Sequence, residues 1–212
     1  MPDHWQKFTL GEVAEVRMGQ QLSPSRRTGS RPRPYLRAAN IGASGIDLVD
    51  VNLMDFSAEE EERYALLPRD ILLVEGGNEK SVGCPALVSD SEKGLCFQNT
   101  LIRCRIRDCG IVVPEFLYFA LLRSFANGEF ARLAQGTTIL HLGQRRAEVF
   151  QIDLPPIAQQ RRIVDLIGAV NGQITSLESQ LDRARTFGDA VLAELLSGER
   201  LLDESYDVAA SL

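Results

Sequence analysis

The sequence predicts an α+β protein, in which a domain of small mixed sheets is followed by one long C-terminal coiled-coil helix. Up to residue 156, short apolar runs alternate with turns rich in Gly, Pro and Ser, which is typical of an α+β domain. Beyond that point, apolar residues recur at alternating steps of four and three, the spacing of a coiled-coil seam. We therefore expect a domain over residues 1–156, a dimerisation or spacer helix over 157–200 and a mobile tail over 201–212.

The first half of the domain is expected to contain short helices, strands and loops. Each helix opens with a capping box, in which Ser or Thr is followed three residues later by Glu, and the capped segments are Thr9–Glu12 and Ser57–Leu66. Apolar runs bounded by turn residues predict strands over Val16–Gln20, Tyr35–Ile41 and Asp70–Glu75. Gly, Pro and Ser predict loops or turns over 21–34, 42–45 and 76–78.

The second half of the domain follows the same pattern. Apolar and alternating runs predict strands over Val82–Val88, Thr100–Arg107 and Val149–Leu154. A helix is expected over Pro114–Phe125, because proline is favoured at the first helical position, and another over Glu129–Ala134. A glycine-led loop follows at residues 136–138.

A single long helix is predicted from Ala158 to Ser197, with Gly198 as its stop signal. At 1.5 Å per residue, about 40 residues span roughly 60 Å. Polar residues flank the seam in the middle, which suits one partner helix, whereas the ends carry a wider apolar face. The alternative is an amphipathic helix folded onto its own domain. The predicted dimer interface consists of Ile163, Ile167, Val170, Ile174, Leu177, Leu181, Ala184, Val191 and Leu195.

Composition narrows the class of protein. The chain has 212 residues, of which 44% are hydrophobic and 25% charged, with a net charge of −6. The sequence contains no signal peptide and no apolar run of membrane-spanning length, so we expect a cytoplasmic protein without a membrane partner. The acidic charge argues mildly against nucleic acid, but a local group of arginines can still bind phosphate. These arginines are Arg26, Arg27, Arg31, Arg33 and Arg37.

The sequence shows no constellation of catalytic residues. It has neither a glycine-rich phosphate loop nor a nucleophile elbow. The cysteines form no Cys-x-x-Cys pair, so buried, reduced thiols are favoured over a metal site, and four consecutive glutamates at 59–62 are interpreted as the solvated face of a helix. We expect no catalytic residue, no metal and no cofactor in this chain. The cysteines are Cys84, Cys96, Cys104 and Cys109.

Several stretches together resemble the specificity subunit of type I restriction–modification enzymes. That family shows a Gly-Thr loop, here Gly136-Thr137, and a Leu-Pro-Pro strand end, here 154–156, followed by Glu-Gln-Arg-x-Ile at the start of a long helix. Gln159 stands where the family usually has Glu. The resemblance extends from residue 5 to about residue 200 and includes Trp5, Leu10–Val13, Gly19, Leu67–Leu73 and Phe97–Asn99.

The resemblance implies a non-catalytic reader of DNA sequence. The domain would be a target-recognition domain that reads double-stranded DNA mainly in the major groove, and the long helix would set a spacing. A methyltransferase (modification) subunit that binds S-adenosylmethionine would carry out the chemistry, and a motor–nuclease (restriction) subunit is a further candidate partner. Family members usually carry two recognition domains and two long helices, whereas this chain carries one of each and resembles a half-subunit.

A half-subunit is expected to form a homodimer that rebuilds the two-domain arrangement. In a two-fold dimer the helices run antiparallel, and the two half-sites must be inverted copies separated by unread bases. Glu178 and Arg185 both occupy e positions of the heptad, which face each other in antiparallel pairs. A two-fold axis near Leu181 would bring Glu178 of one copy against Arg185 of the other.

Three groups of residues are candidates for contacting DNA. Arginine suits phosphate and guanine and glutamine suits adenine, so the basic loop is the first group, with a solvated loop as the alternative interpretation. The second group lies in the glycine turn, and the third lies in and after the Gly-Thr loop. The candidates are Gln20, Gln21, Ser23, Arg26, Arg27, Arg31 and Arg33, then Asn78 and Lys80, then Thr137, Thr138 and His141.

Two other functions stay open on the sequence alone. A coiled-coil dimer whose domain binds protein, without any role on DNA, would fit the acidic net charge. Salt-dependent DNA binding distinguishes that function from a DNA reader, because phosphate contacts weaken steeply with salt. An enzyme that uses the cysteines or His141 is the other alternative, and Cys→Ser variants that retain all function would dismiss it.

Overall fold

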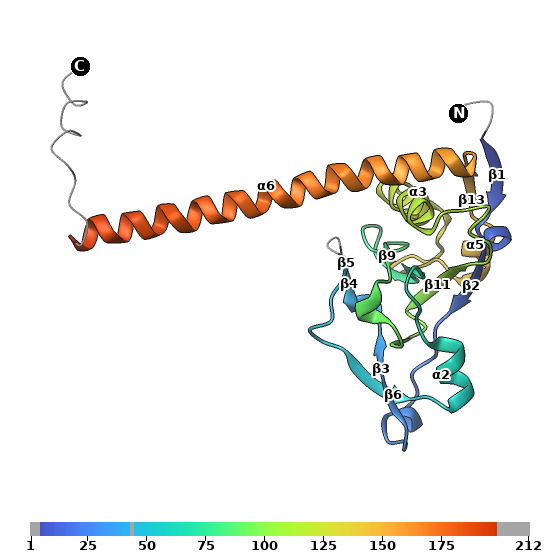
Figure 1. Cartoon of the computed structure of the whole chain (residues 1–212). Coiled ribbons are helices and arrows are strands. Elements are labelled where there is room, and N and C mark those ends of the chain that lie inside the picture. The colour runs from blue at the N-terminus through green and yellow to red at the C-terminus, as the bar shows by residue number, and fades with distance from the viewer. Residues whose placement is uncertain (1–4, 43–44, 199–212) are drawn as a thin grey trace. The chain divides into compact units, whose positions relative to one another are not determined.

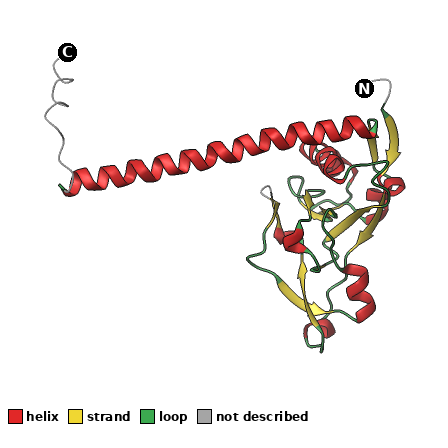
Figure 2. Cartoon of the chain, in the orientation of Figure 1, coloured by secondary structure: helices red, strands yellow, loops and turns green. Residues whose placement is uncertain are grey.

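The computed structural model describes residues 5–42 and 45–198. The chain divides into two compact units between Val164 and Asp165. The first unit holds the sheets and the short helices, and the described part of the second lies in the long helix α6 (Figures 1 and 2). The predicted class, a mixed α+β fold with several small sheets and a long terminal helix, is confirmed. The predicted tail over 201–212 lies outside the described residues.

A four-stranded antiparallel sheet forms the centre of the first unit. Its strand order is β2-β11-β7-β9, so β11 lies between β2 and β7. β7 is buried along its whole length, because its alternate residues pack into two different hydrophobic clusters on the two faces of the sheet. The strands are β2 (Ala14–Met18), β7 (Ile71–Val74), β9 (Pro85–Leu87) and β11 (Leu101–Ile106).

Smaller sheets surround this centre. One has the order β10-β3-β6, and the others are the pairs β1-β13, β12-β8 and β4-β5. The pairing of β1 with β13 joins the two ends of the domain beside the start of α6 (Figure 1). Their strands are β1 (Gln6–Thr9), β3 (Pro32–Leu36), β4 (Ile41–Gly42), β5 (Gly45–Ile46), β6 (Asn52–Asp55), β8 (Gly76–Gly77), β10 (Cys96–Phe97), β12 (Leu140–His141) and β13 (Gln151–Leu154).

The helices begin and end close to the predicted positions. Both predicted capping boxes are present, at Thr9 with Glu12 and at Ser57 with Glu60, and α6 ends at Ser197, where Gly198 has a φ of +77°. The α-helices are α1 (Leu10–Val13), α2 (Ala58–Tyr64), α3 (Pro114–Ala126), α4 (Glu129–Leu133), α5 (Gln144–Glu148) and α6 (Ile157–Ser197). Short 3-10 turns are η1 (Pro24–Arg27), η2 (Ala38–Asn40) and η3 (Asp90–Glu92).

Some predicted elements are wrong in their bounds. Residues 21–34 are not one loop, because η1 forms there and β3 already begins at Pro32. Pro32 and Pro34 of β3 lie opposite β6 at positions that do not donate to it, because the hydrogen bonds to that side involve alternate residues such as Arg31. On the other side of β3, β10 pairs only with Tyr35 and Leu36. No hydrogen bond of either ladder therefore requires the missing N–H groups of the prolines. The strand predicted over Tyr35–Ile41 ends at Leu36, because the 3-10 turn η2 occupies Ala38–Asn40. The sequence also did not predict β1, β6, β8, β10, β12 or α5.

The main hydrophobic core lies between the four-stranded sheet and the helices α1, α3, α4 and α5. Ile163 and Val164, on the first turns of α6, pack against this core. Three of the four cysteines are buried and free, but Cys109 is exposed, so the prediction of buried thiols is wrong for Cys109. No helix among the described residues is long and apolar enough to cross a membrane.

Charged side chains are buried on one face of β11. Arg105 binds Asp70 through two hydrogen bonds, 2.8 Å from Nε to Oδ1 and 2.7 Å from Nη2 to Oδ2, and Asp70 is 2% exposed. Arg103 is 1% exposed, lies 3.1 Å from Glu15 Oε1 and stacks near the ring of Phe97. Such a network is stable only while every buried charge keeps its partner.

Replacing Arg105 with Met is expected to lower the free energy of unfolding by about 3 kcal/mol, because Asp70 would keep a buried charge without its partner. Urea denaturation followed by circular dichroism measures this loss. Arg107→Met changes an exposed arginine just beyond the same strand and should cost less than about 0.5 kcal/mol. Equal losses in the two variants would contradict the assigned role of the ion pair.

Candidate nucleic-acid interface

Helix α2 organises the basic loop, since its N-terminus is closed by a capping box and its C-terminus is tied to the sheet. At its N-terminus, Ser57 Oγ accepts a hydrogen bond from the Glu60 N–H at 3.2 Å, and Glu60 Oε2 accepts from the Ser57 N–H at 2.9 Å. At its C-terminus, Arg103 donates to the Arg63 carbonyl at 3.1 Å and Arg105 to the Ala65 carbonyl at 2.9 Å. Cations at this end also complement the helix dipole. The buried face of β11 therefore sets the position of α2.

Arg26 is bound to α2 and is not a free cation. Its Nη1 and Nη2 donate to the two carboxylate oxygens of Glu60 at 2.9 and 2.6 Å, and Nη1 also donates to the Asp55 carbonyl at 2.9 Å. Gln20 Nε2 donates to Glu60 Oε1 at 3.0 Å. The Arg26 guanidinium, followed by the Ser57 N–H, lowers the pKa of Glu60 to about 2. Glu60 thus holds both Arg26 and Gln20 in place.

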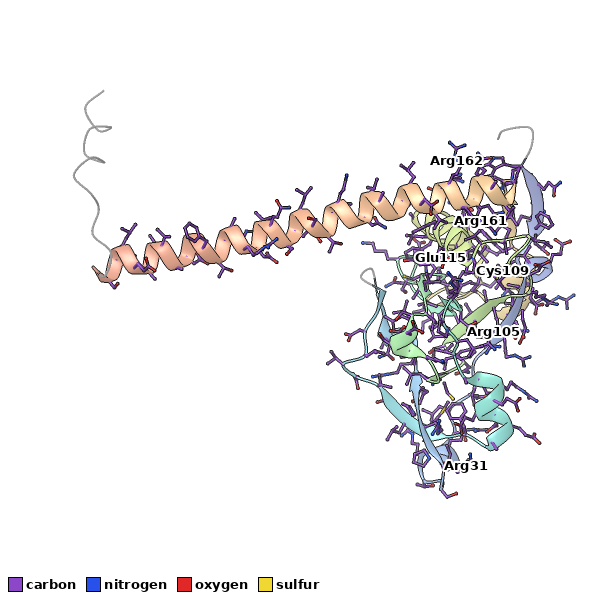
Figure 3. All side chains as sticks on the ribbon, in the orientation of Figure 1. Arg31, Arg105, Cys109, Glu115, Arg161 and Arg162 are labelled. Atoms are coloured by element: carbon purple, nitrogen blue, oxygen red, sulfur yellow. The ribbon has the colours of Figure 1, made fainter. Side chains whose placement is uncertain are left out.

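The neighbouring arginines are also paired within the domain. Arg31 lies 3.3 Å from Glu61 Oε2, and Arg33 forms an ion pair with the same carboxylate. The Asp55 carboxylate accepts the Arg31 backbone N–H at 2.7 Å. Figure 3 shows Arg31 at the end of the globular unit that lies away from Arg161 and Arg162 on the first turns of α6.

The interpretation of residues 59–62 as a solvated face is therefore wrong for two of the four glutamates. Glu60 and Glu61 face the arginines, whereas Glu59 and Glu62 are exposed. Sequence reasoning missed this contact because α2 and the basic loop are about 30 residues apart, and no local pattern pairs them. The run of opposite charges is the only signal that could have suggested it.

One arginine of the basic loop differs from the others. Arg27 is exposed and has no ion pair with any residue in the described ranges, whereas Arg37 pairs with Asp50. Gln21 is exposed as well, and Ser23 Oγ lies 2.9 Å from Ser25 Oγ. The predicted patch of free arginines is thus largely neutralised, with Arg27 left as a cation that can reach a phosphate.

The second and third groups of candidates lie together. β8 pairs with β12, with Gly77 opposite Leu140 and Gly76 opposite His141. The predicted turn at 76–78 is therefore partly wrong, because Gly76 and Gly77 form a strand and the turn starts at Asn78. This pairing places the exposed Asn78 and Lys80 next to the exposed loop that contains Thr137 and Thr138. The five residues predicted in two separate segments form one surface.

The Gly-Thr loop is a tight hairpin. Gln135 and His141 exchange two backbone hydrogen bonds of 3.0 and 2.8 Å across its base. Gly136 has a φ of +138°, and a Cβ there would lie 1.9 Å from the Ile139 carbonyl oxygen, so the turn requires glycine. His141 Nδ1 lies 3.0 Å from Glu75 Oε2. The hairpin exposes Thr137, Thr138 and Ile139 at its tip, and Ile139 was not predicted as a candidate.

The buried thiols and the carboxylates of the described residues supply neither a reactive thiolate nor a cluster of metal ligands. Burial raises the pKa of the Cys96 and Cys104 thiols to about 12, which disfavours the reactive thiolate. Within the described ranges, no three His, Cys, Asp or Glu residues cluster as metal ligands. The described surfaces offer arginine, lysine, amide and hydroxyl groups instead, which are the groups that contact phosphates and base edges.

The family model for the type I restriction modification DNA specificity domain matches residues 2–183 of this chain. The chain belongs to this family. The predictions of a type I specificity subunit and of a non-catalytic role are thereby confirmed. The matched segment contains both loop surfaces and most of α6.

Individual relatives and solved structures agree with this family. The chain is 24% identical over 220 residues to the EcoBI specificity subunit of Escherichia coli and 23% identical over 177 residues to the EcoKI specificity subunit of Escherichia coli strain K12. The alignments cover 97% and 78% of this chain but 41% and 36% of those relatives, so the chain spans less than half of their length.

Two crystal structures share the fold. The S subunit of a type I restriction–modification system from M. genitalium superposes with a TM-score of 0.61 at 19% identity, covering 95% of this chain and 47% of that one. The HsdS subunit from Thermoanaerobacter tengcongensis has a TM-score of 0.58 at 19% identity, with coverage of 92% and 45%. The arrangement of small sheets and a long terminal helix is therefore shared with these subunits.

The pair between Glu60 and Arg26 predicts a specific dependence of stability on pH. Because the pKa of Glu60 is about 2 in the folded protein, below its ordinary value of 4.5, its stabilisation is present above about pH 4.5 and is lost as the pH falls towards 2. Glu60→Gln should lower the free energy of unfolding by about 1 kcal/mol at pH 7. The free energy of unfolding of this variant should also fall less steeply than that of the wild type between pH 4.5 and pH 2. Urea titrations between pH 2 and pH 7 measure both effects. Glu62→Gln, on the exposed side of α2, should follow the wild type.

Proposed function

We propose that this chain is the DNA-reading component of a type I restriction–modification methyltransferase and that it works in the cytoplasm without a cofactor of its own. The family match over residues 2–183 carries this proposal. A methyltransferase subunit would bind S-adenosylmethionine and transfer the methyl group, and a motor–nuclease subunit is a further candidate partner. The globular unit would read one half of a split site in double-stranded DNA.

The two loop surfaces are the proposed DNA contacts. In the basic loop, Arg27 would contact phosphate and Gln21 base edges, while Arg26 and Glu60 hold Gln20 ready for the same role. In the paired turn and hairpin, Lys80 would contact phosphate, and the amide and hydroxyl side chains would contact bases. The hairpin and turn residues are Asn78, Thr137, Thr138 and His141, and the remaining loop residues are Ser23, Arg31 and Arg33.

The long helix is proposed to pair with a second copy of this chain in an antiparallel, two-fold arrangement. Val170, Ile174, Leu177 and Leu181 on its seam are between 47% and 63% exposed, which is unfavourable in water for so many aligned apolar side chains. Two copies would supply two reading domains, and symmetry would then require inverted half-sites separated by unread bases. The domain would comprise residues 1–156 and the pairing helix residues 157–200.

Co-expression with the methyltransferase subunit, followed by mapping of methylated positions in genomic DNA, tests this function. The expected result is one split, palindromic site, with methylation lost when this chain is omitted. An asymmetric site would exclude the homodimer and would require a different second reader. Methylation that does not depend on this chain would exclude the proposed function itself.

A protein-binding module is the second candidate function, because four of the five clustered arginines are neutralised by carboxylates of the same domain. A cation already paired in this way contributes less to phosphate binding. DNA binding that is absent at every salt concentration, with and without the methyltransferase subunit, would favour this alternative.

Arg27→Ala is expected to weaken DNA binding by the complex and to reduce the slope of log affinity against log salt concentration by about 0.9, the effect of one lost phosphate contact. Fluorescence anisotropy over a salt series measures the slope. Arg123→Ala removes an exposed arginine on α3, outside both loop surfaces, and should leave the slope unchanged. A reduced slope in Arg123→Ala alone would place the phosphate contacts elsewhere.

The proposed register of the homodimer predicts a charge-reversal rescue. Glu178→Arg should raise the dissociation constant of the dimer, because it would face Arg185 of the second copy, and Arg185→Glu should act in the same way. The double reversal should restore the wild-type constant. Sedimentation equilibrium measures the dissociation constant of the wild type, the two single variants and the double variant. A double variant that dimerises as weakly as either single variant would place the two-fold axis away from Leu181.

A further inference from the structure

Among the described residues of α6, Gln160 is the most completely buried and has no exposed surface. Its side-chain amide forms three hydrogen bonds, all to backbone groups. Oε1 accepts from the Val113 N–H at 2.9 Å, and Nε2 donates to the Ile111 carbonyl at 3.0 Å and to the Pro155 carbonyl at 2.9 Å. Both amide hydrogens and the carbonyl oxygen therefore have partners, which fixes the side chain in one orientation.

These hydrogen bonds join three segments of the globular unit. Pro155 directly follows β13, whereas Ile111 and Val113 lie in the segment between β11 and α3. The chain passes from β13 into α6 through Pro155 and Pro156, whose rings restrict the backbone, so no flexible linker separates the sheet from the helix. Gln160 thus ties the first turn of α6 to the end of β13 and to the start of α3.

We propose that Gln160 is a positioning residue that makes the root of α6 stiff and thereby limits the length of the unread spacer that the complex accepts. The stiffness concerns a single chain. The consequence for the spacer rests on the proposed function, in which two copies read one split site.

The length of α6 explains why the angle at its root matters. From Gln160 to Leu181 the helix rises about 32 Å. A tilt of about 6° at the root would displace the far point by about 3.4 Å, which is the rise of one base step in DNA. Apolar contacts, such as those of Ile163 and Val164 with the core, have little directionality, whereas hydrogen bonds lose strength when bent. The three bonds of Gln160 are therefore suited to holding the angle within a few degrees.

Distance measurements between spin labels within one chain test the stiffness. Cys109→Ser removes the exposed thiol and leaves the three buried cysteines, so labels can be placed at Arg123→Cys on α3 and at Ser179→Cys on α6. Excess unlabelled chain restricts the dipolar signal to label pairs within one molecule. A reference pair, Arg161→Cys with Ser179→Cys, lies on α6 alone. With Gln160 intact, both pairs should give distance distributions of equal width, and a broader distribution for the first pair would overturn the proposal.

Two variants then remove the hydrogen bonds. Gln160→Met keeps the size of the side chain and loses all three bonds, and Gln160→Glu keeps only the bond from the Val113 N–H. Each should broaden the first distribution at least about twofold, in line with the directionality of the lost bonds. Arg162→Met places methionine at an exposed position two residues later in the same helix and should leave the width unchanged. A folded Gln160 variant with the wild-type width would overturn the proposal.

Methylation assays on split sites test the consequence for the spacer. The wild-type complex should methylate one spacer length, and Gln160→Met should raise the relative rate on sites one base longer or shorter by about tenfold, with the half-site sequence unchanged. A broadened distance distribution with an unchanged spacer profile would overturn the link to spacing. Absence of split-site methylation by the wild type would instead reject the proposed function, and the distance widths would still decide whether Gln160 stiffens the root.

Discussion

The burial of charge on one face of β11 is the constraint on which the arrangement of α2 and of the proposed DNA-contacting loop depends. Arg105 needs Asp70, and Arg103 needs Glu15 and the carbonyls at the end of α2, because an unpaired charge in the interior is far more costly than an exposed one. Meeting these needs fixes α2 beside the sheet. The glutamates of α2 then determine where the arginines of the basic loop lie, about 30 residues earlier in the chain.

The ion pairs of the basic loop reconcile an acidic chain with a DNA-reading family. An arginine held by a carboxylate adds little to non-specific attraction for phosphate, but its orientation and that of its neighbours are defined before DNA arrives. Gln20, which shares Glu60 with Arg26, is ordered in this way. Under the proposed function, this arrangement favours selectivity for sequence over non-specific affinity for DNA.

The start of α6 and the rest of the helix differ in their surroundings. Its root is anchored by a buried, fully hydrogen-bonded glutamine and by apolar contacts with the core, whereas the seam from Val170 to Ala184 is exposed in the single chain. The root therefore belongs to the folding of the domain, and the seam suits association with another chain. The proposed spacer role requires both properties, because a loose root or an unpaired seam would leave the distance between two domains undefined.

The sequence by itself determined the features that depend on local patterns: the α+β class, both capping boxes, the long helix with its stop at Gly198, and the candidate loops. It could not determine which distant charges meet, because the pairing of Glu60 with Arg26 and of Gly77 with Leu140 leaves no local signature. It also left the two-residue strands unseen, since only a partner strand makes such short segments extended. Tertiary structure alone decided that four clustered arginines are paired with carboxylates and that Arg27 has no such partner among the described residues, because the distance between charges is set by the fold.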